Sequence, residues 1–236
     1  MSEEPGYHNR QLALATTIRG MLCDLGPSTY NEIAPNIAYW IEYGITGEFA
    51  TTDDLVERVS PVAWGRYGSD SDISRFLKEF RDAPHRSEQA RSFVDKLCRF
   101  ILRWFAIGSV ENVQADCRWS NVSPDGSYGF IHAASFVGHL IDCGLLGHDL
   151  VRQNLVKPLI SHHYYNDNGP GKAVRANAIY RLFIAAGNTL LQGVLEPEDV
   201  QVCFETVDSQ ITLERIQGLD AARLNVRCDS RFGASH

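Results

Sequence analysis

Apolar residues near the N-terminus recur at intervals of three or four, which is the spacing of one helix face. The members of this first run are Leu12, Ala15, Ile18, Leu22 and Leu25. Gly26 and Pro27 follow the run directly. Pro27 has the backbone φ of a first helical position and Gly26 is a tolerable N-cap, so the pattern predicts a second helix that begins at Pro27.

The second helix has an apolar face of its own, made by Tyr30, Ile33, Ala34, Ile37, Trp40 and Ile41. Pro35 lies inside this run and predicts a kink, because proline removes a backbone donor and crowds the preceding turn. The connection between the two helices is too short for anything but adjacent antiparallel helices. The chain is therefore expected to open with an αα-hairpin.

Helical patterning continues through the middle of the chain. Thr51 or Thr52 can cap a helix over 53–59 that ends before Pro61. A short helix is predicted over 73–80 and a long one over 87–107. The long helix carries a wide apolar stripe, which predicts burial from two sides; its members are Phe93, Val94, Leu97, Phe100, Ile101, Trp104 and Phe105.

A polar loop is expected near 108–127, where Asn121, Ser123-Pro124 and Asp125-Gly126 are turn signals. Helices are predicted over 128–143, from about Leu150, through 173–187, from Glu196 and over 220–230, with a flexible tail after 230. No strand-like alternation of useful length occurs. The prediction is an all-α protein: one helical-repeat domain over 1–236, built as a HEAT-like stack of about five antiparallel hairpins. An irregular helical bundle is the alternative, because no exact repeat occurs.

Composition and charge narrow the class of protein. The formal charge is −7, which disfavours nucleic-acid binding driven by net charge. There is no apolar run of membrane-spanning length and no signal-like N-terminus. The six cysteines form no C-x-x-C pair, so they are expected to be reduced thiols. These features predict a cytoplasmic protein, with the nucleus as the alternative.

Catalytic and metal-binding motifs were sought in the same way. The "NGPGKA" stretch departs from a phosphate-binding loop, because Asn166 and Ala173 replace its glycine and its hydroxyl residue. His132, His139 and Cys143 could be drawn as metal ligands, but no further ligand is indicated and packing of a helix face explains them without a metal. His162-His163 is expected to be exposed in a loop. The sequence therefore predicts no catalytic residue, no metal and no cofactor.

Lys96, Arg99 and Arg103 recur at three and four positions in the predicted long helix. Arg86 and Arg91 extend the basic character toward its start. These residues predict either a contact strip for phosphates or an acidic partner, or a solvated helix face neutralised by nearby acids such as Glu88 and Asp95.

Four segments resemble the middle domain of the eukaryotic initiation factor 4G family. "IRGMLCDLGPSTYNEI" is similar to the helix junction at the start of that domain, on Ile18, Arg19, Leu22, Leu25, Pro27, Tyr30 and Ile33. "ASFVGHLIDCGLLGHDLVRQNLVKPLI" resembles its third-repeat hairpin, on Phe136, Val137, Gly138, Leu140, Leu145 and Leu146. "RANAIYRLFIAAGNTL" resembles the helix that follows, and "LDAARLNVRCDSR" echoes the closing helix. Ser135 and His139 depart from the family pattern, and 60–127 aligns poorly.

The resemblance implies a non-enzymatic adaptor built from stacked helical hairpins. Family members dock DEAD-box RNA helicases, and in some cases RNA or other mRNA-associated proteins, in translation initiation or RNA processing. Two alternatives stand beside this reading. One is an RNA-binding module that uses Lys96, Arg99 and Arg103, and the other is a helical protein-interaction scaffold unrelated to translation.

Overall fold

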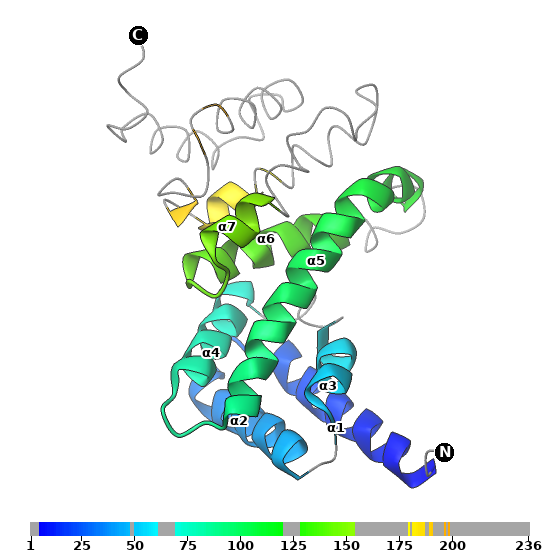
Figure 1. The fold of residues 1–236 in the computed structure, drawn as a ribbon, viewed down its shortest axis with the longest axis vertical. Helices are drawn as coiled ribbons and strands as arrows, with labels where there is room; N and C mark the ends of the chain where they lie inside the picture. The colour runs from blue at the N-terminus through cyan, green and yellow to red at the C-terminus, as the bar shows by residue number, and fades with distance from the viewer. Residues whose placement is uncertain are drawn as a thin grey trace. The chain divides into compact units, whose positions relative to one another are not determined.

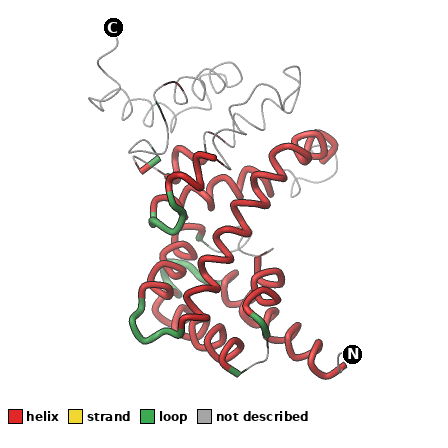
Figure 2. Tube along the Cα trace, viewed as in Figure 1, coloured by secondary structure: helices red, strands yellow, loops and turns green. Residues whose placement is uncertain are grey.

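The computed structural model is all-helical throughout its described residues, as the sequence predicts (Figures 1 and 2). Those residues are 5–47, 50–60, 69–119, 128–153, 179, 181–186, 189–190, 196 and 198. The chain divides into two compact units, Met1–Ile101 and Leu102–His236. Among the described residues, no helix has both the length and the apolar character needed to cross a membrane. The HEAT-like stacking stays a prediction.

The first unit opens with the expected hairpin of α1 (Pro5–Cys23) and α2 (Tyr30–Thr46). The two helices run antiparallel, because the side chain of Leu14 in the middle of α1 lies against Gly44 near the end of α2. The predicted start at Pro27 is wrong, since α2 begins at Tyr30. The reason is the Thr29 hydroxyl, which donates to the Asp24 carbonyl at 2.6 Å and accepts from the Gly26 amide at 3.0 Å, so it closes a turn across the glycine and proline.

Side-chain caps define where the next two helices start. α3 (Thr52–Val59) has the predicted N-cap, Thr51, which forms a reciprocal capping box with Asp54. α4 (Asp70–Asp82) starts three residues earlier than predicted, because the Ser69 hydroxyl accepts from the Asp72 amide. The Ser69 amide donates to the Leu25 carbonyl at 3.1 Å, which ties the start of α4 to the end of the first helical run.

The long helix α5 (Glu88–Trp119) continues well past its predicted end. The expected loop over 108–127 is therefore wrong for residues 108–119, which are helical, while 120–127 lie outside the described residues. The physical reason is that 109–119 contains no proline, and the single Gly108 costs a helix only about 1 kcal/mol. All the turn signals that motivated the loop lie after residue 119.

The N-terminal part of α5 contributes buried side chains to the core of the first unit. Its residues Phe93, Val94, Leu97, Cys98 and Ile101 are all at most 1% exposed, which confirms the burial of this part of the predicted stripe. Phe100 is half-buried, and the side chains of Trp104 and Phe105 lie outside the described residues. The other helices contribute large buried side chains to this core, among them Ile18, Leu25, Ile37, Ile41, Leu55, Ile73, Phe76 and Leu77. The amphipathic stripes found in the sequence therefore face inward for the most part. The exceptions are Leu12 of the first run, which is 47% exposed, and Ile33 and Trp40 of the second, which are half-buried.

The second unit contains α6 (Tyr128–Asp142) and α7 (His148–Val151), which match predicted helices. Gly144 turns the chain between them with a positive φ of 70°. The helical residues 181–186 pack tightly on α6 at Gly138. A Cβ built on Gly138 would lie 2.6 Å from the Ala185 Cβ and 2.9 Å from the Leu182 carbonyl oxygen. The remaining predicted helices, the "HHYYNDNGPGK" loop and the tail lie largely or wholly outside the described residues.

The close packing at Gly138 yields a stability prediction. Gly138→Ala is expected to lower the free energy of unfolding by about 1–3 kcal/mol, because the added methyl group meets backbone atoms that cannot rotate away. Gly20→Ala in α1 is the matched control. It enters open space and is expected to raise stability by about 0.5–1 kcal/mol. Urea unfolding followed by circular dichroism tests both variants, and equal shifts of the same sign would contradict this account.

Candidate functional site

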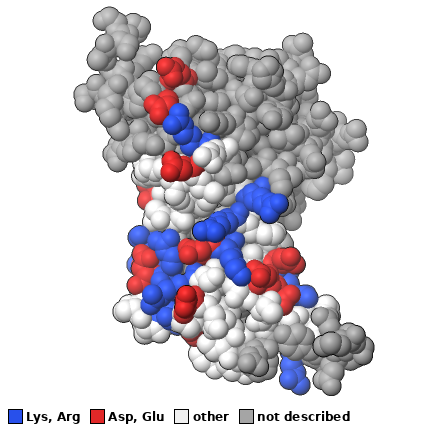
Figure 3. Space-filling view, viewed as in Figure 1, with Lys and Arg blue, Asp and Glu red and all other residues white. Residues whose placement is uncertain are grey.

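The predicted basic residues Lys96, Arg99 and Arg103 all lie in α5 and are all exposed. Figure 3 shows lysine and arginine side chains over the middle of this helix. The division between the two units falls after Ile101, so Lys96 and Arg99 belong to the first unit and Arg103 to the second.

Only part of the strip's charge is left uncompensated. The Lys96 ammonium lies 2.8 Å from an Asp53 carboxylate oxygen at the start of α3. The compensating acid thus comes from another helix, which spacing along α5 could not reveal. Asp95, the neighbour expected to neutralise the strip, lies 3.8 Å from Arg81 instead. Within the described residues, Arg99 and Arg103 form no ion pair.

The two other arginines near the start of α5 have structural contacts. The Arg86 guanidinium lies 4.8 Å above the centre of the Phe80 ring and 4.0 Å from a Glu42 carboxylate oxygen. The other oxygen of Glu42 accepts from the Ser87 amide at 3.2 Å. Arg91 donates to the Pro84 carbonyl at 3.0 Å. These contacts hold the loop before α5 against the end of α2 and do not extend a free basic surface.

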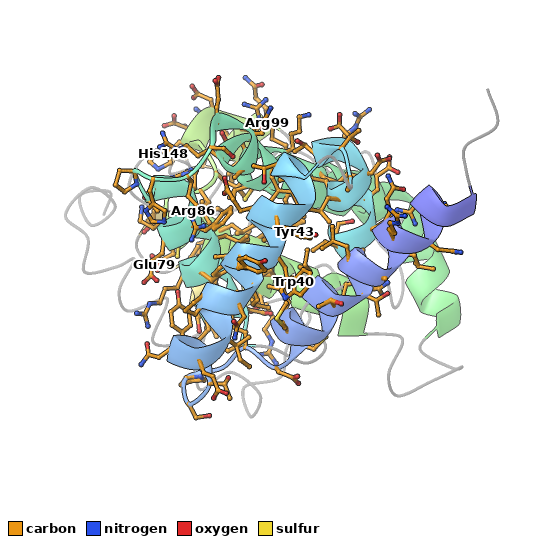
Figure 4. All side chains as sticks on the ribbon, turned by 90° about the horizontal axis from the view of Figure 1, so that it is seen from below. Trp40, Tyr43, Glu79, Arg86, Arg99 and His148 are labelled. Atoms are coloured by element: carbon orange, nitrogen blue, oxygen red, sulfur yellow. The ribbon has the colours of Figure 1, made fainter. Side chains whose placement is uncertain are left out.

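The structure adds a surface cluster of three aromatic side chains on α2, which we call the aromatic cluster: Tyr39, Trp40 and Tyr43. Tyr39 and Tyr43 stack with ring centres 5.8 Å apart and planes 11° apart. Trp40 meets each of them edge-on, with ring centres at 5.6 and 5.8 Å. Figure 4 shows Trp40 and Tyr43 on the same stretch of α2. A single helix therefore presents a compact aromatic surface.

Two members of the aromatic cluster are exposed, and the third, Trp40, is half-buried. Tyr39 is 58% exposed and Tyr43 is 42% exposed, which makes them two of the four large exposed apolar residues in the described part of the chain. Sequence reasoning placed Trp40 on the buried face and did not consider the two tyrosines. The available signal was their spacing of four, which joins them on one side of the helix.

A polar cluster joins α2 to α4 within the first unit. The Tyr30 hydroxyl donates to Glu79 at 2.7 Å, and Arg75 donates to the same carboxylate at 2.8 Å. The Arg75 guanidinium also lies 4.2 Å above the Tyr30 ring. Burial and the bond to Glu79 raise the pKa of Tyr30. Burial alone would raise the pKa of Glu79, but hydrogen bonds from Tyr30 and Arg75 outweigh it and hold that pKa below its usual value.

This arrangement stabilises the protonation state that each of the three groups ordinarily has at neutral pH. Glu79 stays ionised, Tyr30 stays protonated and Arg75 stays cationic at neutral pH. General acid–base catalysis requires a group whose pKa lies near the working pH, and this cluster shifts its groups away from it. The cluster is therefore built to join two helices.

No group of three potential ligands suited to a metal ion occurs among the described residues. Burial lowers the pKa of His139, while the nearby Asp142 opposes that shift. Cys143 lies in the turn after α6, and its thiol is not part of a disulfide. The side chain of His132 and the residues His162-His163, Asn166 and Ala173 lie outside the described part.

The chain was also compared with known proteins. No family model, no curated protein and no solved structure matches it.

The charge geometry gives a prediction for RNA binding. Changing Arg99 and Arg103 together to Glu is expected to affect affinity for a fluorescent oligouridine no more than changing the exposed Arg10 and Arg181 to Glu. The reason is that Lys96 is already paired and the whole chain carries a charge of −7. Fluorescence anisotropy at low and moderate salt measures this. A selective loss of affinity, with a shallower salt slope, would assign phosphate contacts to the strip.

The Tyr30–Glu79 bond gives a prediction about pH. Tyr30→Phe is expected to lower the free energy of unfolding by about 0.5–1 kcal/mol at neutral pH, since one partner is exposed. Because the folded pKa of Glu79 is lowered, its contribution is present above the ordinary carboxylate pKa and is lost as pH falls through the lowered value. The difference between wild type and variant should therefore shrink in acid, below about pH 4.

Urea unfolding at neutral pH and below about pH 4 measures this difference in stability between wild type and Tyr30→Phe. Tyr39→Phe is the matched control, because it removes a hydroxyl from an exposed tyrosine and should leave stability unchanged. A Tyr30→Phe effect that is independent of pH would show that Glu79 does not carry it.

Proposed function

We propose that this protein is a non-enzymatic helical adaptor that docks a protein partner through the first unit. The observation that carries the proposal is the exposed aromatic cluster on α2. Tyrosine and tryptophan are enriched among the residues that dominate binding energy at protein interfaces. They supply large contact area with few rotatable bonds, so ordering them on binding costs little.

The way α2 is held supports this role. The helix buries Ile37, Ala38 and Ile41 against the unit, so the opposite side is fixed in space. The Tyr30–Glu79 bond fixes its start, and the Glu42–Ser87 bond fixes its end. A partner would therefore meet a surface that is already ordered, which reduces the entropic cost of association.

The class of partner comes from the sequence resemblance. The resemblance to the initiation factor 4G middle domain favours a DEAD-box RNA helicase or another mRNA-associated protein. On this proposal the chain acts in the cytoplasm, in translation or RNA processing, and supplies a docking platform with no chemistry of its own. The described clusters support that reading, because their titratable groups are engaged in joining helices.

Calorimetry with the DEAD-box helicase of translation initiation from the same organism tests the proposal. The expected result is micromolar or tighter binding in at least one state, with or without an ATP analogue and single-stranded RNA. Tyr39→Ala is expected to weaken binding about tenfold or more, which corresponds to about 1.4 kcal/mol or more.

Ile184→Ala is the matched control, because it truncates another exposed apolar residue in the second unit. Equal losses in the two variants would remove the aromatic cluster from the interface. The absence of heat in every nucleotide and RNA state would reject the helicase as the partner.

A further inference from the structure

The exposed side of α2 combines aromatic rings with negative charge. The helix sequence "YNEIAPNIAYWIEYGIT" contains two glutamates and no lysine or arginine. Glu32 is exposed and lies seven residues before Tyr39, which places it two turns away on the same side of the helix. Glu42 lies beside the cluster in sequence and is half-buried.

Charge complementarity follows from this composition. A cationic ligand would find the aromatic faces, whose π-systems attract cations, together with the Glu32 carboxylate. A nucleic acid could stack its bases on the same rings, but α2 offers no basic side chain to receive its phosphates. The overall charge of −7 also favours a basic ligand over a nucleic acid.

The chain itself shows which cation suits its aromatic rings. Arg75 lies 4.2 Å above the Tyr30 ring, and Arg86 lies 4.8 Å above the Phe80 ring. Both contacts join a guanidinium to an aromatic face in the same unit. The planar guanidinium stacks on a ring and donates to a carboxylate at once, whereas the compact lysine ammonium is more strongly hydrated. Tyr39, at 58% exposed, is available for a third contact of this type.

We propose that the aromatic cluster on α2 binds an arginine-bearing segment of a protein partner. A guanidinium stacks on the Tyr39 ring, and a second positive charge about two turns along the segment faces Glu32. This inference rests on the proposed function, in that it names the chemistry of the segment that docks at the cluster. It does not depend on the partner being a helicase.

Titration of the full chain with two capped peptides and one RNA oligonucleotide tests the inference. The probes are an oligoarginine, a length-matched oligolysine and an oligouridine, and the readout is NMR chemical-shift change at α2 together with fluorescence anisotropy. Oligoarginine is expected to bind about two- to fivefold more tightly than oligolysine, which is the range of an exposed cation–π contact. Glu32→Gln is expected to weaken the binding of both peptides.

Neutral substitutions separate ring contacts from general attraction to an acidic chain. Tyr39→Ala is expected to weaken oligoarginine binding about two- to fivefold and to remove its advantage over oligolysine. Tyr39→Phe keeps the ring and should bind like the wild type. Ile184→Ala, which also leaves the charge unchanged, should have no effect.

Four results would overturn the inference: equal affinity for the two basic peptides, no response to Tyr39→Ala, tighter binding of oligouridine at α2, or occupation of the cluster by a second copy of the chain. Sedimentation equilibrium of the wild type and Tyr39→Ala detects the last of these. The outcome is separable from the helicase test. If oligoarginine binds and the helicase does not, the arginine inference stands and the helicase proposal fails. If the helicase binds at Tyr39 and the peptides show no arginine preference, only the arginine inference is overturned.

Discussion

The arrangement of the first unit depends on how α2 is held from both ends. Its inward face packs through Ile37 and Ile41, and this burial removes apolar area from water and sets which side of the helix faces solvent. The hydrogen bond from Tyr30 to Glu79 near its start and the bond from Ser87 to Glu42 near its end add direction. Because hydrogen bonds require defined geometry, the two contacts reinforce the orientation that the buried face sets.

Arginine contributes to this unit mainly as a connector. Arg75 and Arg86 each combine an aromatic face with a carboxylate, and Arg91 reaches backbone carbonyls in the loop before α5. Such contacts suit the guanidinium, which stacks and donates in one plane. The consequence is that a high arginine content does not by itself make a nucleic-acid surface here, since several of the charges serve to join helices and loops.

The amphipathic pattern was sufficient to predict most helices and the inward faces of the first unit. Helix caps formed by side-chain hydrogen bonds, such as that of Thr51, were also predictable from the sequence, because the donor and acceptor are three residues apart. The start of α2 was missed because the Thr29 hydroxyl bonds backward into the turn, and propensity rules give Pro27 priority. The pairing of Lys96 with Asp53 was beyond sequence reasoning, since the two residues meet only through tertiary packing.

The aromatic cluster was missed for a different reason, and its energetics limit what it can do alone. Periodicity assigns a residue to a face but does not say whether an exposed aromatic is functional. Burying the exposed parts of Tyr39 and Tyr43 would contribute about 2 kcal/mol each, given about 25 cal/mol per Å² of apolar area. Micromolar affinity needs about 8 kcal/mol, after association costs are met. The cluster is therefore an anchor within a larger interface, and the charge of the surrounding surface must decide which partner it holds.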